Sequence, residues 1–553
     1  MVQSLVKLSL FSGICFWSLL TLAEGITKTS EVYNYIDDPA VSTKVVIDLR
    51  SKGKEISSAF YGAHIDSGSP APAASLIKDL GVGMIRMGGN EYDVFNWKNG
   101  YALTESGLRT LPGFVNTAKA LNQYQVPGVY QINLHGYQPE LVNDNYVLKR
   151  TFTASAAADL IKTLNGKQNL GLVHFSLGNE PEQWYETHSQ AGNTQAISAD
   201  EYIQRYIDFA LAIRKAQEEV NGNPNSIKLW GPEMSASWLD WNTGNFAKDC
   251  QWHGTNIGQV VCSYGNGAFQ NFLPYFLDRV AKAEKDPKVN PRHYKLLDYF
   301  SFHYYATLRT KISDVGSIIA DPDGNQWISK ILESTQVLTN PNYVNNYDMS
   351  SYRKIKSNVF GRMKMWRDTY YPSAKLSLNE FAVDSDYRST RYHPIVRPLY
   401  MADVIASAAT QGIDFFNNFI LNSAPGDNSA WAMIDGDRPT NLYYMYALFS
   451  NNFKGAILNT ADNANDVINS YAVDADPFIQ LALINKSPTD KKVQIYFQSD
   501  RLMKVATHLV PGWSSSILKI DKRLPRNGGT LDVSQFGATE MAITKDPKYD
   551  KYP

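Results

Sequence analysis

Two acidic residues, Glu180 and Glu380, each follow a short apolar strand pattern and an asparagine. Apolar and polar side chains alternate over Val173–Leu177, which predicts a strand with two differently used faces. Pro181 disfavours helix at the residue before it, so the Glu180 carboxyl group should lie where a strand ends and a loop begins. Lys375–Val383 repeats the arrangement. Hydrolysis of a glycosidic bond needs two carboxyl groups, one to protonate the leaving oxygen and one to attack the anomeric carbon or activate water.

These acids need a frame in which the carboxyl ends of parallel strands share one rim. Eight short apolar strand patterns alternate with helical patterns, which predicts an α/β fold of the (β/α)8 TIM barrel type. The strands are predicted at Ala59–His64, Val82–Met87, Gly128–Leu134, Val173–Leu177, Ile227–Gly231, Tyr299–Tyr304, Lys375–Leu378 and Ile413–Ile420. Helices are predicted at Ala156–Leu164, Ala199–Glu219, Gly267–Lys285 and Val359–Asp368. Glu180 would end the fourth strand and Glu380 the seventh, so the two acids would converge at the mouth.

After residue 449 the pattern changes to short strands separated by turns, which predicts an additional β-sandwich domain. Its strands are predicted at Ala456–Leu458, Val467–Val473, Phe478–Ile484, Lys492–Phe497, Lys504–Leu509, Ser514–Ile520 and Thr539–Thr544. An N-terminal strand at Lys44–Leu49 would complete the sandwich. The predicted division is a signal peptide at 1–23, an N-terminal segment at 24–57, the catalytic barrel at 58–450, and the sandwich with a tail at 451–553.

The N-terminus resembles a secretory signal, because Lys7 precedes an apolar run that ends near Ala23. A membrane anchor is the alternative, but the run is short and interrupted by polar residues. We expect a secreted or periplasmic protein with no membrane attachment after signal removal. Once Cys15 is removed, Cys250 and Cys262 remain, and a disulfide between them would contribute about 3 kcal/mol. Two free thiols are the alternative.

Charge and composition limit the classes of partner that the chain is expected to bind. The 53 basic and 54 acidic residues nearly cancel, which argues against a nucleic-acid surface. Aromatic residues make up 12% of the chain, which suits stacking on sugar rings, although most of them are expected in the core. The expected partner is a polysaccharide or oligosaccharide, and the chain is expected to be a monomer.

Several stretches together resemble glycoside hydrolase family 44, the endoglucanases and xyloglucanases of the retaining clan A. The matching stretches are Ile85–Asn90 with Phe95–Trp97, Leu177–Trp184 with Thr187–His188, Phe302–Tyr305, Tyr370–Pro372, Lys375–Phe381 and Leu481–Lys486. They follow the same order over most of the mature chain, and the family's barrel with a sandwich from both chain ends agrees with the predicted fold. Two departures lie beside the acids: Gly178 replaces an aspartate, and Asn379-Glu380-Phe381 replaces Thr-Glu-Tyr.

The resemblance implies Glu180 as general acid/base and Glu380 as nucleophile. Asn179 would hydrogen-bond the sugar 2-hydroxyl, and Arg86 with Tyr304 or Tyr305 would hold the nucleophile ionised. The remaining substrate-binding candidates lie in or near rim loops: Asn90, Trp97, His135, Trp184, Glu233, His303 and Trp431, the last as a stacking floor. For Arg86 the alternative is a structural ion pair, and Glu233 could be a third acid rather than a subsite hydrogen-bonder.

No metal ligand set is predicted. His64, His135 and His303 lie near strand ends, but their neighbours favour hydrogen bonding to sugar. Asp321–Asn325 resembles a calcium loop without the required glutamate. The family resemblance implies a structural calcium ion that the sequence does not place. No cofactor is expected, because carboxylates supply both the proton and the attack.

The leading hypothesis is a secreted retaining endo-β-glycanase that hydrolyses β-1,4-glucan or xyloglucan. A heparanase-like enzyme on uronic-acid polymers is an alternative, but it would need a basic cleft, and only Arg86, Arg109 and Arg388 stand near the predicted mouth. Algal galactan remains open as a substrate. The alternative from another class is a non-hydrolytic glycan-binding barrel.

Overall fold

The computed structural model describes residues 25–65, 68–184, 197–235, 250–252, 260–306, 325–343, 357–383, 394–427, 429–464, 467–524 and 529–538. The predicted signal peptide, the strand predicted at 539–544, residues 321–324 of the calcium-like stretch, Arg388 and residues 187–188 lie outside them.

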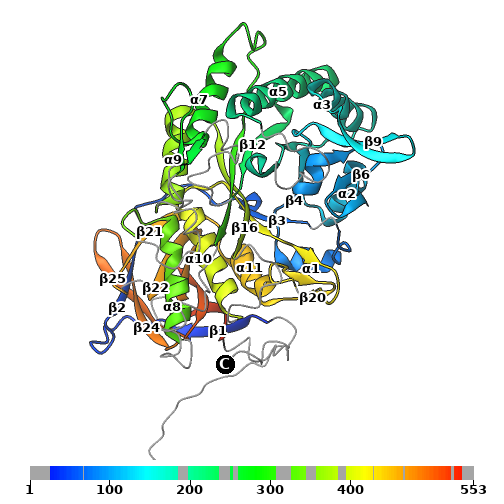
Figure 1. The fold of residues 1–553 in the computed structure, drawn as a ribbon. Coiled ribbons are helices and arrows are strands. Elements are labelled where there is room, and N and C mark those ends of the chain that lie inside the picture. The colour runs from blue at the N-terminus through cyan, green and yellow to red at the C-terminus, as the bar shows by residue number, and fades with distance from the viewer. Residues whose placement is uncertain are drawn as a thin grey trace, which may run out of the picture.

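A closed barrel of eight parallel strands stands at the centre of the molecule (Figure 1). Its strands are β3 (Tyr61–His64), β4 (Met84–Met87), β8 (Gly128–Ile132), β11 (His174–Leu177), β12 (Lys228–Met234), β15 (Tyr299–Ala306), β16 (Lys375–Val383) and β17 (Phe415–Phe419). Each coincides with one of the eight predicted strands, so the predicted barrel is confirmed. The strand order around the barrel follows the chain, with β17 pairing β3 to close it.

Helices surround the barrel. They are α1 (Ala74–Leu80), α2 (Phe114–Tyr124), α3 (Ala154–Ile161), α5 (Ala199–Asn221), α7 (Phe272–Lys285), α8 (Asn325–Glu333), α9 (Val359–Tyr370), α10 (Val396–Thr410) and α11 (Asn441–Asn452). The four predicted helices correspond to α3, α5, α7 and α9. Among the described residues, none of the helices combines the length and apolar character needed to span a bilayer.

Strand β15 shows how the alternation of side chains builds the interior. Its outward residues, such as Phe302 and Tyr304, are buried in the apolar layer beneath the helices. Its inward residues begin with Tyr299, whose ring stacks on Trp230 with centroids 3.8 Å apart at the bottom of the barrel. Further up the same face, His303 and Tyr305 reach the mouth, because successive inward positions along a strand rise toward its carboxyl end.

The second domain is a mostly antiparallel sheet that combines both chain ends. Its strands, in spatial order, are β1 (Thr27–Val32), β27 (Thr530–Gly537), β26 (Ser514–Asp521), β23 (Phe478–Asn485), β22 (Ile468–Ala475), β21 (Ala456–Asp462), β2 (Thr43–Asp48), β24 (Lys491–Gln498) and β25 (Leu502–Val510). The first half of β21 pairs with β22 and its second half with β2, so the sheet turns over at this strand into two layers. Figure 1 shows β2, from the N-terminus, among the C-terminal strands.

The sandwich packs on the barrel because β23 is apolar on both faces. Leu481 and Leu483 point into the core between the two layers, whereas Ala482 and Ile484 join the larger core beneath the barrel helices. The sequence does not predict two strands of the sandwich. Strand β1 is polar and mostly exposed, so it carries no alternation of apolar residues. Strand β27 lies in a stretch for which the sequence analysis predicts no strand.

Short sheets of two or three strands extend the mouth. One is a three-stranded sheet of β5 (Phe95–Asn96), β6 (Tyr101–Thr104) and β7 (Gly107–Thr110), and another pairs β9 (Tyr137–Val142) with β10 (Asn145–Arg150). A third comprises β18 (Asn422–Ser423), β19 (Ile434–Asp435) and β20 (Arg438–Pro439). A fourth pairs β13 (Cys250–Trp252) with β14 (Val260–Cys262), and its register sets Cys250 opposite Cys262.

Candidate active site

Glu180 lies just past the end of β11, as predicted. The chain turns at Gly178, whose φ of 79° suits glycine, and a Cβ there would approach Trp184 to 3.3 Å. Glu180 itself adopts a left-handed conformation, with φ 39° and ψ 58°, before Pro181 opens the short helix η4 (Pro181–Gln183). Such a conformation is costly for a residue with a side chain, and it directs the Glu180 carboxyl group inward.

Glu380 is held in β16 at the same level. The register between β15 and β16 shifts after Phe302, so that His303 faces Glu380 and Asn379 becomes an extra residue. A bulge of this kind turns the following side chain. One ligand atom of Glu180, one of Glu380 and one of His303 all lie within 4.8 Å of one another. The two acids, separated by two hundred positions in the chain, therefore meet at the mouth.

Their separation indicates the stereochemical course. Carboxyl groups about 5–5.5 Å apart leave room for direct attack on the anomeric carbon, whereas inversion needs at least about 6.5 Å for an intervening water molecule. One oxygen of Glu180 and one of Glu380 lie within 4.8 Å of each other, a close approach that is compatible with direct attack.

Two hydrogen-bond donors hold Glu380, and one of them, Arg86, is also a cation. Arg86, fully buried in β4, donates from Nη1 to Glu380 Oε1, and the Tyr305 hydroxyl donates to Oε2 at 2.5 Å. Burial raises the pKa of Glu380, but the nearby His303 and Arg86 lower it further, to about 2. Glu380 is therefore ionised at mildly acidic and neutral pH.

His303 connects the two acids. Its Nδ1 lies 2.9 Å from Glu180 Oε1 and 3.5 Å from Glu380 Oε2. Burial lowers the pKa of His303, yet the surrounding carboxylates, Glu380 foremost, raise it to about 10, so the ring is an imidazolium. For Glu180, burial raises the pKa and outweighs the hydrogen bond from His303, with Glu380 adding to the rise. The surroundings thus shift the pKa values of the two acids apart, with that of Glu180 raised and that of Glu380 lowered.

The same three residues, Glu180, His303 and Glu380, offer a set of atoms that could in principle surround a metal ion. However, both ring nitrogens of His303 face carboxylates, because Nε2 lies 3.2 Å from Glu233. A doubly protonated imidazole donates hydrogen bonds and has no lone pair for a metal. The chemistry of this donor set therefore favours proton transfer over metal binding.

Asn179 is fixed beside the acids. Its Oδ1 accepts a hydrogen bond from Arg86 Nη2 at 2.7 Å, and its Nδ2 donates to the Asn90 side chain at 2.9 Å. Its backbone N–H donates to Asp93 Oδ1 at 3.0 Å. Asp93 also accepts a hydrogen bond from the Trp184 indole at 3.1 Å. A carboxylate from another loop thus lies beside the strand end where Gly178 replaces the aspartate of family 44.

Five predicted substrate-binding residues lie elsewhere than expected. The Trp184 indole is buried and hydrogen-bonded, and it packs against the buried His135 ring at 4.8 Å, so neither offers a free face to a sugar. Tyr304 points outward and stacks with Phe381. Glu233 is fully buried below the two acids. Trp97 is half-buried and packs against the barrel core.

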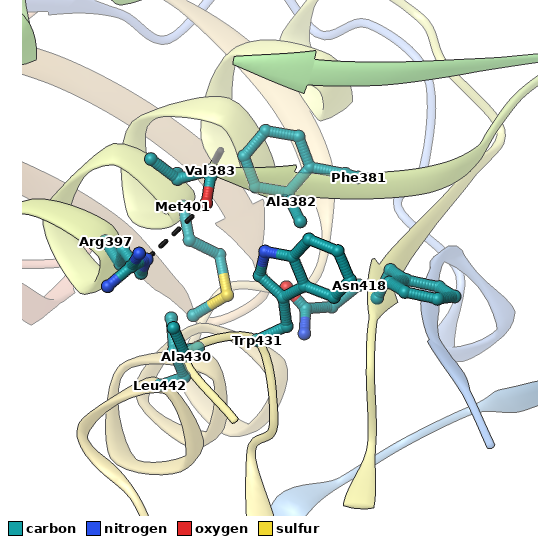
Figure 2. A pocket seen from close by; sticks show the side chains of 10 residues that line it. Phe381, Ala382, Val383, Arg397, Met401, Asn418, Ala430, Trp431 and Leu442 are labelled. Atoms are coloured by element: carbon teal, nitrogen blue, oxygen red, sulfur yellow. Dashed lines mark hydrogen bonds between the residues drawn. The ribbon is translucent and has the colours of Figure 1, made fainter. Parts of the chain in front are cut away.

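Trp431 lies at the mouth and is half-buried. Its ring contacts those of Tyr305 and Phe419, with centroids 6.0 and 5.3 Å apart. It also borders a small hollow that extends toward Arg397, whose side chain donates to the Val383 carbonyl (Figure 2). Trp431 is therefore placed where a sugar ring bound over the acids could meet it.

Sequence reasoning missed several site residues. Asp93 and Glu182 lie in rim loops and are buried, which no pattern in the sequence indicated, although each is an acid next to a predicted rim stretch. His64 was considered only as a rim hydrogen-bonder. Its Nδ1 accepts from Arg86 at 2.9 Å, and burial together with Arg86 lowers its pKa to about 3, so it is neutral.

Comparisons with known proteins agree with this geometry. Residues 128–308 match the model of glycoside hydrolase family 44, a span that contains Glu180 but not Glu380. The predicted resemblance to that family is confirmed, and the match agrees with the prediction of a glycoside hydrolase. A search among curated proteins found no match.

Solved structures of the same fold cover nearly the whole chain. A family 44 xyloglucanase from Paenibacillus polymyxa is 15% identical with a TM-score of 0.62, over 90% of this chain and 99% of that one. A family 44 endoglucanase from Clostridium thermocellum is 15% identical with a TM-score of 0.60, over 89% and 99%. A family 51 arabinofuranosidase from Xanthomonas axonopodis pv. citri is 14% identical with a TM-score of 0.52, over 89% and 100%. At these identities the likeness establishes the fold.

The buried Glu182 generates a prediction about stability. It accepts a hydrogen bond from the Ser235 backbone, and burial, with Glu180 nearby, raises its pKa to about 8. Between pH 4.5 and 8 the folded chain keeps a proton that the unfolded chain releases, so this residue lowers the free energy of unfolding as pH rises, by at most about 1.4 kcal/mol per unit. Glu182→Gln should remove that slope. The gain in Tm over the wild type should therefore grow from pH 5 to pH 8, and parallel curves would contradict the assignment.

Proposed function

We propose that this glycoside hydrolase family 44-like chain is a secreted, monomeric, retaining endo-β-glycanase that hydrolyses β-1,4-glucan or xyloglucan. The observation that carries the proposal is the pair Glu180 and Glu380, whose carboxylate oxygens lie within 4.8 Å and whose pKa values are shifted in opposite directions. An acid that keeps its proton beside a carboxylate that has lost its own is the arrangement that retaining hydrolysis needs.

In the proposed first step, Glu180 donates its proton to the leaving glycosidic oxygen while Glu380 attacks the anomeric carbon. The bond to the leaving sugar breaks and an ester bond to Glu380 forms. In the second step, the Glu180 carboxylate removes a proton from water, which attacks the anomeric carbon and releases Glu380. Arg86 and Tyr305 keep the Glu380 oxygens oriented, and Asn179 is placed to hydrogen-bond the sugar 2-hydroxyl.

A neutral glycan suits the charges at the mouth better than a uronic-acid polymer. Arg86 is paired with Glu380, and Arg109 is paired with Glu91. Neither described arginine is therefore left to bind a substrate carboxylate. The Paenibacillus polymyxa xyloglucanase, whose structure includes bound xyloglucan, supports a polymer of this class.

The proposal is tested by incubating the purified protein with cellulose derivatives, xyloglucan, mannan, algal galactans and uronic-acid polymers, with product sizes recorded. Release of internal fragments from the β-1,4-glucans or xyloglucan is expected. Activity restricted to galactans or uronic-acid polymers would replace the substrate. Binding without release of reducing ends on any polymer would favour a glycan-binding barrel.

The roles of the two acids lead to a paired mutational prediction. Glu180→Gln and Glu380→Gln should each lower kcat at least about a hundredfold, because one loses the transferable proton and the other the nucleophile. Both variants should keep the wild-type Tm to within a few degrees. Nuclear magnetic resonance of the earliest product should show the same anomeric configuration as the substrate. Inverted product, or wild-type turnover in either variant, would refute the assignment.

Trp431 is proposed as the stacking floor. Trp431→Ala should raise KM about tenfold with a smaller effect on kcat, since a face that binds ground state and transition state alike is lost. Trp431→Phe keeps an aromatic face and serves as the matched control, with a KM between the two. Equal KM values in all three proteins would exclude a stacking role.

Export is proposed together with a disulfide between Cys250 and Cys262. Directly opposed residues in an antiparallel pair have Cα atoms about 4.5–5.5 Å apart, which lies within the range that a disulfide spans. Mass spectrometry of the unreduced mature protein should show a mass about 2 Da below that of the reduced protein, because two thiol hydrogens are lost. Two alkylatable thiols without reductant would contradict the disulfide.

A further inference from the structure

We propose that Glu233 is a positioning residue that acts through His303: it keeps the imidazole doubly protonated and oriented between the two acids, and does not contact substrate. The proposal rests on the proposed hydrolytic function and assigns a task to the third carboxylate of the mouth.

Three donors occupy Glu233 from inside the barrel. Oε1 accepts from the Ser301 hydroxyl at 2.9 Å, and Oε2 accepts from Asn379 Nδ2 at 2.7 Å and lies 3.2 Å from His303 Nε2. The Glu233 side chain has no exposed surface. With three partners and no exposed surface, the Glu233 carboxyl group is placed to act on its buried neighbours and not on a substrate in the mouth.

The backbone ties Glu233 to the acid/base as well. The register of β12 against β15 shifts between Pro232 and Met234, and Glu233 between them has φ 59°. Its carbonyl oxygen accepts the Glu180 N–H at 2.9 Å. Two neighbouring glutamates in the left-handed region, joined by a hydrogen bond, are a costly local arrangement of the kind that gathers at functional sites.

The side chains that face His303 determine what Glu233 does. Nδ1 faces the carboxylates of Glu180 and Glu380, and Nε2 faces that of Glu233. The remaining charged group of this cluster, Arg86, is engaged by Glu380 and Asn179. With Glu233 ionised, each ring nitrogen has an anionic acceptor and the ring keeps both protons. Without it, one ring nitrogen loses its charged acceptor and the second proton is held less tightly.

The state of His303 in turn bears on both acids. Its positive charge lowers the pKa of Glu380 and, through the hydrogen bond, opposes the rise in the pKa of Glu180. Loss of the imidazolium charge should therefore raise the pKa of Glu180 and move the alkaline limb of the pH–rate profile to higher pH, while misorientation of the ring lowers kcat.

The test compares Glu233→Gln with the wild type on the polysaccharide that the wild type hydrolyses. We expect kcat to fall at least about tenfold with KM within about twofold, and the alkaline limb of kcat/KM to move up by about one pH unit. Glu182→Gln is the matched control, because Glu182 is an equally buried carboxyl group of the same rim without a contact to His303. Its replacement removes no acceptor from His303, so the imidazole should titrate in Glu182→Gln at the same pH as in the wild type.

A second measurement does not depend on activity. The ¹⁵N resonances of His303 in the wild type, assigned with His303→Gln, should be those of an imidazolium at pH 8, and in Glu233→Gln the ring should titrate at a lower pH. A neutral ring in the wild type at pH 8 would overturn the inference. So would an unshifted pH profile in folded Glu233→Gln. Failure of the wild type to cleave any polysaccharide would instead count against the proposed hydrolytic function.

Discussion

The structure of the mouth depends on a balance of buried charge. Five ionisable groups, Glu180, Glu233, Glu380, Arg86 and His303, lie together and largely shielded from solvent. Burying charges is expensive unless they are paired and hydrogen-bonded. Arginine and imidazolium supply two positive charges, and Glu233 and Glu380 supply two negative ones. A proton retained on Glu180 would let these charges cancel, which agrees with the raised pKa of this residue.

The barrel brings these groups together because its strands pair in regular register at the bottom and change register near the mouth. At the bottom, flat rings such as Trp230 and Tyr299 stack and fill the interior. Near the mouth the ladders between β12 and β15, β15 and β16, and β16 and β17 each change register. Bulges re-aim side chains without breaking the sheet. Three consecutive irregular ladders are therefore what directs Glu233, His303 and Glu380 toward one point.

The sandwich contributes to this frame from outside. One face of β23 closes the core between the two layers of the sandwich, and the other packs beneath the barrel helices. A buried polar cluster reinforces the contact: Asp403 of α10 accepts hydrogen bonds from Asn469 at 2.8 Å and Tyr471 at 2.6 Å, and Lys486 lies 3.6 Å away. Since α10 connects β16 to β17, the second domain braces the part of the barrel that carries Glu380.

The amino-acid sequence by itself determined the eight barrel strands, most strands of the sandwich and the two acids at strand ends, because these follow from local patterns: alternation, strand length, and Asn-Glu after an apolar run. It did not determine which residues contact the two acids in the folded chain. Tyr305 rather than Tyr304 faces Glu380, Trp184 is buried, and Glu233 lies beneath the acids, because bulges and loop turns decide side-chain direction and leave no periodic signal. Asp93 joined the site from a separate loop for the same reason. Protonation was likewise decided only in three dimensions, since each pKa depends on burial and on charges that are distant along the chain.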